Sequence, residues 1–347
     1  MGFDLRSHGR RRRVGRACCV SVFASLVGCG SRTEIDGIDR AADASHASDA
    51  SVCVATNASA HGAAPPDAPA ADVAGVTRWF GVSSIAMGAG TSWQRIGYDV
   101  DGRVARACDA CRARFGAAPV DEGSDGIDNA FGRVVVRAIS NQGLDPQAVT
   151  DHAYRKGEGT LLLRLDDLAH ESNDARVPGA IYLTSAYGGE PSYTVADQWL
   201  VANTALADGV DIDRPTIRFP SGYMRNGIWV SGDGGPQTIP VPMLGAIVAL
   251  RFERVVISVR VVDGTNGILA GVVHADDLPS ALAPALDALG LCAGDARRAA
   301  VEGAARGAAD LGGDATCDLV SIGLAFTLNV VTQPTSTTRP AAAPVCR

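Results

Sequence analysis

Basic and aromatic residues are scarce in this chain of 347 residues, and their scarcity argues against several functions. The chain has 31 lysine and arginine residues against 38 aspartate and glutamate residues, and Lys156 is its only lysine. Nucleic acids and anionic lipid headgroups call for basic patches, so neither is an expected partner. Aromatic residues make up 5% of the chain, so most of them are expected in the core.

Complete hydrolase motifs are also absent from the sequence. There is no Gly-x-Ser-x-Gly elbow, because Gly227 lies four residues before Ser231 rather than two, and there is no His-Glu-x-x-His. Carboxylate pairs of the glycosidase type and a possible acid/base cluster remain as candidates, but turns and helix caps use the same residues. A secreted hydrolase is therefore the alternative to a non-catalytic protein, with candidates Asp166 and Asp167, Asp211 and Asp213, and His274-Ala275-Asp276-Asp277.

No apolar run near the N-terminus reaches the roughly 20 residues of a membrane-spanning helix. Residues 17–28 form a shorter apolar stretch behind six arginines, which is the layout of a secretory signal. The stretch ends in Leu26-Val27-Gly28-Cys29, which resembles the lipobox of bacterial lipoproteins. The resemblance implies cleavage before Cys29 and acylation of that cysteine, so residues 1–28 are predicted to be the lipoprotein signal peptide.

The lipoprotein resemblance also implies a location. In this family an aspartate after the lipidated cysteine favours retention in the inner membrane, whereas this chain has Gly30. The outer membrane is therefore expected, with the periplasmic and the cell-surface face both open. Without residues 1–28 the chain has 25 basic and 37 acidic residues, so its contact with the membrane is expected to be the lipid anchor alone.

Composition divides the rest of the chain into three parts. Residues 41–72 contain no Leu, Ile, Phe, Trp or Tyr, so they cannot bury enough apolar surface to offset the entropy cost of ordering. Residues 29–75 are predicted to be a lipidated flexible linker spanning roughly 35–40 Å. Residues 76–332 are predicted to form one β-rich globular domain, and residues 333–347 a C-terminal tail.

The cysteines predict a disulfide framework. Cys18 and Cys19 leave with the signal and Cys29 is reserved for lipid, so six remain: Cys53, Cys108, Cys111, Cys292, Cys317 and Cys346. In an oxidising exported setting these predict three disulfides, with fifteen possible pairings. Cys292 and Cys317 bracket a helical segment and are the preferred pair. Cys108 with Cys111 closes a local loop, which leaves Cys53 with Cys346 by elimination.

The segment Cys108-Asp109-Ala110-Cys111 also has the spacing of a thioredoxin-type redox pair. However, the preceding Tyr98-Asp99-Val100-Asp101-Gly102 predicts a strand entering a turn, not a βαβ unit. No second Cys-x-x-Cys completes a zinc site. A structural disulfide is therefore favoured over a redox or metal role.

Short β-prone runs separated by turn residues dominate the domain. In the longest run, Val255, Ile257, Val259 and Val261 alternate onto one face, the pattern of a half-buried strand. Asn226-Gly227 between apolar flanks predicts a hairpin. The runs cover residues 78–87, 94–99, 160–166, 180–187, 216–219, 237–243, 246–262, 268–274 and 318–331.

Helical patterns interrupt these strands. Apolar residues recur at helical spacing from Phe131 to Ile139, and Asp145-Pro146 begins a helix that Gly157 ends. Another helix begins at Leu278, with Pro284 forcing a kink or restart, and residues 295–311 form an alanine-rich helix. The expected fold is mainly β (α+β), an antiparallel β-sandwich with inserted helices.

An acidic segment between residues 121 and 129 is the strongest candidate for site chemistry. Its sequence, Asp121-Glu122-Gly123-Ser124-Asp125-Gly126-Ile127-Asp128-Asn129, spaces carboxylates and glycines as a calcium loop requires. Asp121, Asp125 and Asp128 are the predicted ligands, and calcium is the possible cofactor. The segment resembles part of the Asp-rich loops of thrombospondin type 3 repeats, but it lacks the first Asp-x-Asp pair.

A solvated turn is the competing interpretation of the acidic segment. In that case Asp128 or Asn129 caps the following helix. Asp99-Val100-Asp101-Gly102 either contributes a second set of oxygens or forms another plain turn.

A binding function requires side chains that reach the surface. Aromatic platforms for sugar rings could come from Trp79, Trp93, Trp199, Trp229, Tyr187 and Tyr193. The chain also resembles a group of uncharacterised myxobacterial-type secreted lipoproteins, which implies no activity. The resemblance rests on Cys29-Gly30-Ser31-Arg32-Thr33-Glu34 and on residues 126–132, 270–273 and 317–326.

The expected function is therefore a disulfide-stabilised binding or structural module on a lipid anchor. A calcium-stabilised carbohydrate-binding or adhesion module is the more specific alternative. A glycan or a surface protein is the expected partner.

Overall fold

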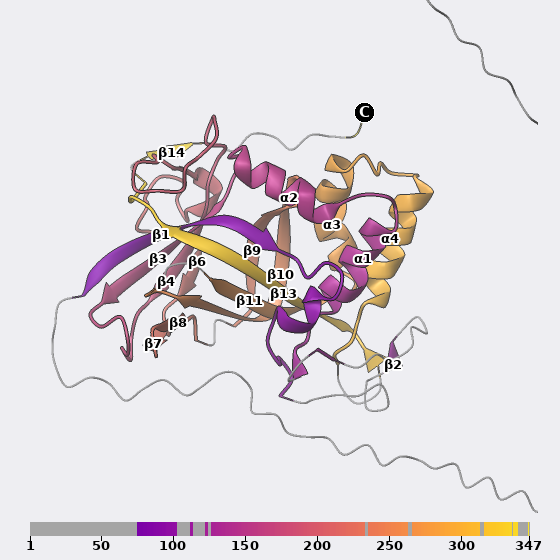
Figure 1. The fold of residues 1–347 in the computed structure, drawn as a ribbon, viewed down its shortest axis with the longest axis horizontal. Helices are drawn as coiled ribbons and strands as arrows, with labels where there is room; N and C mark the ends of the chain where they lie inside the picture. The colour runs from indigo at the N-terminus through magenta and orange to yellow at the C-terminus, as the bar shows by residue number, and fades with distance from the viewer. Residues whose placement is uncertain are drawn as a thin grey trace, which may run out of the picture. The chain divides into compact units, whose positions relative to one another are not determined.

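The computed structural model describes residues 75–102, 112–113, 122–123, 126–232, 235–262, 266–312, 316–334, 336–338 and 346, which all belong to the compact unit Val52–Arg347. Within these residues, one ten-stranded antiparallel sheet has the order β6-β4-β3-β1-β13-β11-β10-β8-β7, with β9 paired to β10 (Figure 1). The mainly-β α+β class is confirmed. The strands belong mainly to this one sheet, which is strongly curled.

The strands of this sheet match most of the predicted runs. They are β1 (Val76–Ala86), β3 (Leu161–Leu168), β4 (Gly179–Leu183), β6 (Ile217–Phe219), β7 (Tyr223–Arg225), β8 (Ile228–Val230), β9 (Gln237–Met243), β10 (Ala246–Arg260), β11 (Gly267–His274) and β13 (Leu319–Val330). Two short parallel pairs join β2 (Arg112–Ala113) to β12 (Thr316–Cys317) and β5 (Leu200–Ala202) to β14 (Ser336–Thr338).

The curl brings distant strands of the sheet together. Gln237 Nε2 on β9 donates to the carbonyl oxygen of Arg218 on β6 at 3.0 Å. Trp229 on β8 packs against Gly179 on β4, where an added Cβ would lie 2.3 Å from the indole. Apolar side chains fill the inside and leave a void of only about 30 Å³ among residues such as Leu162 and Ile257. The inside is a packed core.

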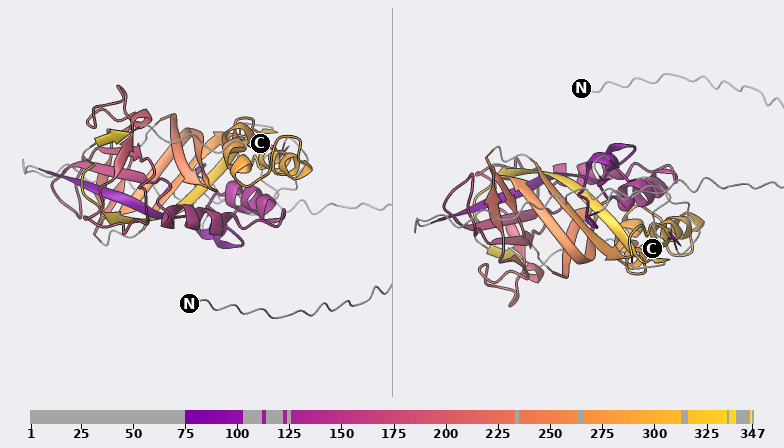
Figure 2. Two further views of the ribbon diagram at one scale, coloured as in Figure 1. Left: turned by 90° about the horizontal axis from the view of Figure 1, so that it is seen from above. Right: turned by 90° about the horizontal axis from the view of Figure 1, so that it is seen from below.

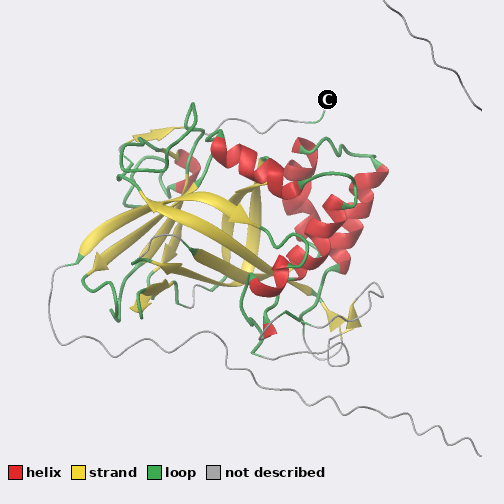
Figure 3. Ribbon diagram, viewed as in Figure 1, coloured by secondary structure: helices red, strands yellow, loops and turns green. Residues whose placement is uncertain are grey.

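Most helices gather at one end of the sheet (Figures 2 and 3). They are the 3₁₀ helix η1 (Ser92–Arg95), the π-helix η3 (Phe131–Val136) that continues into α1 (Arg137–Ser140), α2 (Pro146–Arg155), α3 (Leu278–Ala288) and α4 (Ala296–Gly307). The 3₁₀ helix η4 (Asn203–Ala205) lies apart from them and contacts β4. Helix α3 packs on β10, α2 on β1 and β9, and η3 on β13 and α4. None of the described helices is long and apolar enough to cross a membrane.

Two predicted elements differ from the structure. The strand expected over residues 94–99 is wrong: η1 occupies its start, and Tyr98 forms an isolated bridge with Asp128. Helix α4 ends at Gly307, before the expected residue 311, because Asp310 and Leu311 form backbone bonds with Leu319. In both places long-range pairing outweighs local propensity.

Helix α2 covers an open part of the β1 edge. The side chain of Asp145 accepts the N–H of Ala148 at 2.9 Å, as the predicted cap requires. Gln147 Nε2 donates to the carbonyl oxygen of Ile85 at 2.7 Å, and its Oε1 accepts the N–H of Met87 at 3.3 Å. The amide of Gln147 thus replaces a neighbouring strand at this edge.

The disulfide pairing differs from the prediction. Cys292, after α3, is bonded to Cys346, with their Cα atoms 5.7 Å apart. The preferred pair Cys292–Cys317 and the pair Cys53–Cys346 are therefore wrong. Cys317 is also disulfide-bonded. It lies in β12, which pairs with β2. Cys29, Cys53, Cys108 and Cys111 lie outside the described residues.

Candidate metal centre

Two segments meet where the chain enters η3. The backbone N–H of Asp128 donates to the carbonyl oxygen of Tyr98 at 3.0 Å, and the N–H of Val100 donates to Asp128 Oδ2 at 2.8 Å. Within the turn after Tyr98, the N–H of Gly102 donates to Asp99 Oδ1 at 2.6 Å. Gly102 has a φ of +76°, a backbone conformation that favours glycine. These bonds hold Asp99 beside Asp128.

Three carboxylates converge at this junction. Asp99, Asp101 and Asp128 each offer an oxygen, and these oxygens lie within 4.8 Å of one another. Asp99 and Asp128 are buried, at 4% and 1% exposure. Calcium binds oxygen at about 2.3–2.6 Å, so two of its ligands lie at most about 5 Å apart. The oxygen set therefore fits one hard divalent cation.

Further carboxylates surround this centre and repel its negative charge. Burial raises the pKa of Asp128 to about 9, and the charges of Asp310, Glu122 and Asp101 add to the effect against the Val100 hydrogen bond. Burial also raises the pKa of Asp310 to about 6, although Ser321 donates to it. A bound divalent cation would offset this repulsion and favour the ionised carboxylates.

Within the part of the chain that the structure describes, Asp128 Oδ1 at the centre lacks a hydrogen-bond partner. Among the described residues nothing donates to Asp128 Oδ1, although this atom is buried. Buried polar atoms are nearly always satisfied by protein, water or an ion, and leaving one unsatisfied costs about 1–3 kcal/mol. The acidic cluster and this orphaned oxygen together point to a cation ligand.

Asn129 has a structural role beside the centre. Its Oδ1 accepts the N–H groups of Gly132 and Gly323, and its Nδ2 donates to the carbonyl oxygens of Ile96 and Gly323. Asn129 therefore provides the predicted helix cap and also links η3 to β13. Its four hydrogen bonds hold the segment that carries Asp128.

The structure brings together only part of the predicted ligand set. Asp128 lies at the centre, whereas Asp121 and Asp125 lie outside the described residues. Asp99 and Asp101, expected either as further oxygens or as a turn, are the carboxylates that join Asp128. Sequence reasoning missed Asp310, because nothing in the local pattern around an alanine-rich helix indicates a buried acid.

Two of the hydrolase candidates, Asp166 and Asp213, bind the same arginine. Arg164 binds Asp166 through Nε at 2.9 Å and Asp213 through Nη1 at 2.8 Å. The same guanidinium lies 5.7 Å from the ring centroid of Trp79, so these carboxylates are held in an ion-pair network. His274 Nε2 lies 3.6 Å from Glu253 Oε1 at the surface.

The candidate aromatic platforms belong mostly to the core. Trp79, Trp93, Trp199 and Trp229 are all at most 9% exposed. Tyr187 and Tyr193 pack against Trp199 with tilted rings, and their ring centroids lie 4.9 and 5.4 Å from that of Trp199. Buried indoles cannot stack on a sugar ring, so a glycan site at these tryptophans is excluded.

Comparison with known proteins adds no homologue. The chain matches no known family, no curated protein and no solved structure.

Proposed function

We propose that this chain is an outer-membrane lipoprotein whose anchor displays a non-catalytic, calcium-stabilised binding module. The observation that carries the calcium assignment is the buried Asp128 Oδ1, which has no hydrogen-bond partner among the described residues and lies beside the carboxylates of Asp99 and Asp101. The lipobox before Cys29 supports the anchor, and the six arginines with their apolar stretch support export.

The proposed role of the cation is to hold the module's folded state. The two segments that supply its ligands are distant in sequence, because Asp101 and Asp128 lie 27 positions apart, so one ion would cross-link them. A ligand that binds only the folded state stabilises it by about 2.7 kcal/mol at 100 times its Kd. Sites of extracellular modules have Kd values of roughly 0.1–1 mM, so millimolar calcium is the relevant range.

The calcium assignment is tested by thermal unfolding and titration calorimetry of the full chain with calcium and with chelator. We expect calcium to raise the Tm and to bind with about one ion per chain, and we expect Asp128→Asn to abolish both effects. Asp167→Asn is the matched control, because Asp167 is exposed and its φ of 54° suits asparagine. An unchanged Tm together with no heat of binding would reject the cation.

The anchor is tested separately by fractionation and by labelling with a fatty acid. Cys29→Ser is expected to lose the label and to leave the membrane fraction or be processed aberrantly. Cys19→Ser is the control, since that cysteine is predicted to leave with the signal. Unchanged labelling of Cys29→Ser would refute the anchor.

A further inference from the structure

The outer face of the curled sheet carries an open groove. Strand pairing places Val230, Ser258, Ile268, Ala325 and Ala86 in one row across β8, β10, β11, β13 and β1. Trp229 and Val259, which alternate with residues of this row, are buried on the opposite, inner face. Ser258 is buried, whereas Ala86, Val230, Ile268 and Ala325 are partly exposed and form a floor of small and aliphatic side chains.

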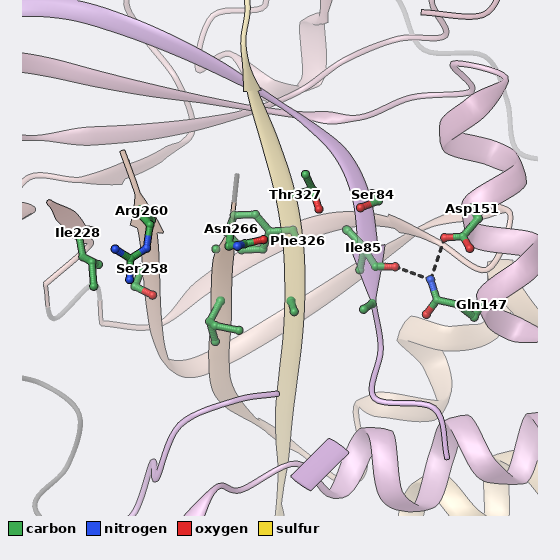
Figure 4. A pocket seen from close by; sticks show the side chains of 14 residues that line it. Ser84, Ile85, Gln147, Asp151, Ile228, Ser258, Arg260, Asn266, Phe326 and Thr327 are labelled. Atoms are coloured by element: carbon green, nitrogen blue, oxygen red, sulfur yellow. Dashed lines mark hydrogen bonds between the residues drawn. The ribbon is translucent and has the colours of Figure 1, made fainter. Parts of the chain in front are cut away.

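Two hollows follow this floor. One has a volume of about 410 Å³ and extends from Arg260 to Asp151 of α2 (Figure 4). The second has a volume of about 390 Å³, and the two hollows share Ile228 and Ser258. The first hollow crosses four neighbouring strands from β10 to β1, and their three spacings of about 4.8 Å add up to about 14 Å. The groove is long enough for an extended ligand.

Polar groups of opposite charge mark the two ends of the first hollow. Arg260 is exposed, and among the described residues its guanidinium has no hydrogen bond or ion pair. At the other end, Gln147 Nε2 donates to Asp151 Oδ1 at 2.8 Å. This bond fixes Asp151, and no group in the described part of the chain bonds its Oδ2.

Arg225 extends the cationic end. It pairs with Ile228 in the β7–β8 register, and Ile228 pairs with Arg260 in the β8–β10 register. The three residues therefore share one face of the sheet. Two guanidinium groups flank an aliphatic side chain at this end.

We propose that this groove binds a linear glycan that carries a carboxylate. The carboxylate pairs with Arg260, ring C–H faces pack on the aliphatic floor, and a sugar hydroxyl donates to Asp151. Arginine recognises carboxylates through charge-assisted hydrogen bonds. The groove is a different site from the acidic centre of Asp99, Asp101 and Asp128, and it identifies the ligand class of the proposed binding module.

The charge pattern favours a glycan over other partners. A nucleic acid or an anionic membrane presents many negative charges, which Asp151 and the net charge of −7 disfavour. An acyl chain needs an enclosed apolar cavity, whereas the interior void measures only about 30 Å³. A sugar with one acidic group can place its carboxylate at Arg260 and a neutral hydroxyl at Asp151.

The test measures binding of the full chain to a trisaccharide that contains one glucuronic acid, with the all-glucose trisaccharide as the neutral counterpart. We expect the acidic sugar to bind more tightly, and Arg260→Gln to weaken its binding about tenfold. Arg260→Gln should leave binding of the neutral sugar unchanged, and Asp151→Asn should weaken both sugars. Arg137→Gln, on the exposed face of α1, is the matched control.

Several results would overturn the proposal. These are equal binding of the two sugars, no binding of either, or an Arg260→Gln variant that binds like the original chain. Binding to vesicles of anionic lipid instead of the sugar would replace the glycan by a membrane surface. The titration is repeated in calcium-free buffer, so that failure of the cation site and failure of the groove are distinguishable.

Discussion

The hydroxyl of Tyr98 is hydrogen-bonded to the hydroxyl of Ser258, 160 residues away on the outer face of β10. Tyr98 directly precedes Asp99 of the acidic centre, and Ser258 lies on the floor of the groove. One side-chain contact thus connects the two sites proposed for this protein. Burial raises the pKa of the Tyr98 phenol, so its hydroxyl stays protonated at neutral pH.

Removing either hydroxyl is expected to destabilise the fold. Tyr98→Phe and Ser258→Ala should each lower the free energy of unfolding by about 1 kcal/mol. The double variant should lose less free energy of unfolding than the sum of the two single losses, because both substitutions break the same interaction. Urea unfolding of the four proteins measures this coupling, and strictly additive losses would contradict the contact.

The carboxylate of Asp197 is expected to make stability depend on pH. Burial alone would raise its pKa, but donation from Thr194, Tyr187 and Ser192 outweighs burial and holds the pKa below its usual value. A group with a depressed folded-state pKa stabilises the protein above its unfolded pKa, near 3.9. That stability is lost as the pH falls through the folded-state pKa.

Asp197→Asn should therefore unfold more easily than the original chain at pH 7, by about 1–3 kcal/mol. The difference should shrink below about pH 4 as the original carboxyl becomes protonated. Melting curves from pH 7 to pH 2.5 provide the measurement, with Asp167→Asn as the control. A difference that stays constant over this range would show that the charge of Asp197 does not matter.

Any side chain at position 179 is expected to clash with Trp229. An added Cβ at position 179 would lie 2.3 Å from the buried indole, and overpacking of this kind costs about 1–3 kcal/mol. Gly179→Ala should lower the Tm. Gly303→Ala in α4 is the matched comparison, because no atom lies within 4 Å of its added Cβ, and it should raise stability by about 0.5–1 kcal/mol. Equal effects of the two substitutions would refute the packing described for β4 and β8.

The Cys292–Cys346 bond is expected to stabilise the C-terminal part of the module. It closes a loop with a sequence separation of 54 residues, for which chain entropy predicts about 4 kcal/mol. Replacing both cysteines by serine should lower the midpoint of chemical unfolding. Non-reducing peptide mapping should recover the peptides of Cys292 and Cys346 as one linked pair, and a Cys292–Cys317 link would contradict this pairing.

The sequence by itself determined the local elements of this fold. The alternation of Val255, Ile257 and Val259 predicted β10, Asn226-Gly227 predicted the β7–β8 hairpin, and Asp145 predicted the start of α2. Periodicity, turn residues and caps act within a few residues of the chain, so their signals can be read locally. Helix η3 was also predicted despite its valines, because its apolar spacing is helical.

Only the tertiary structure decided which distant residues meet. It placed Asp99 and Asp101 against Asp128, Asp310 near the same centre, and Cys292 against Cys346. It also aligned Arg260 and Asp151 along one groove. These contacts depend on how the sheet curls and which strands pair, and local propensity carries no information about residues that lie tens of positions apart in the chain.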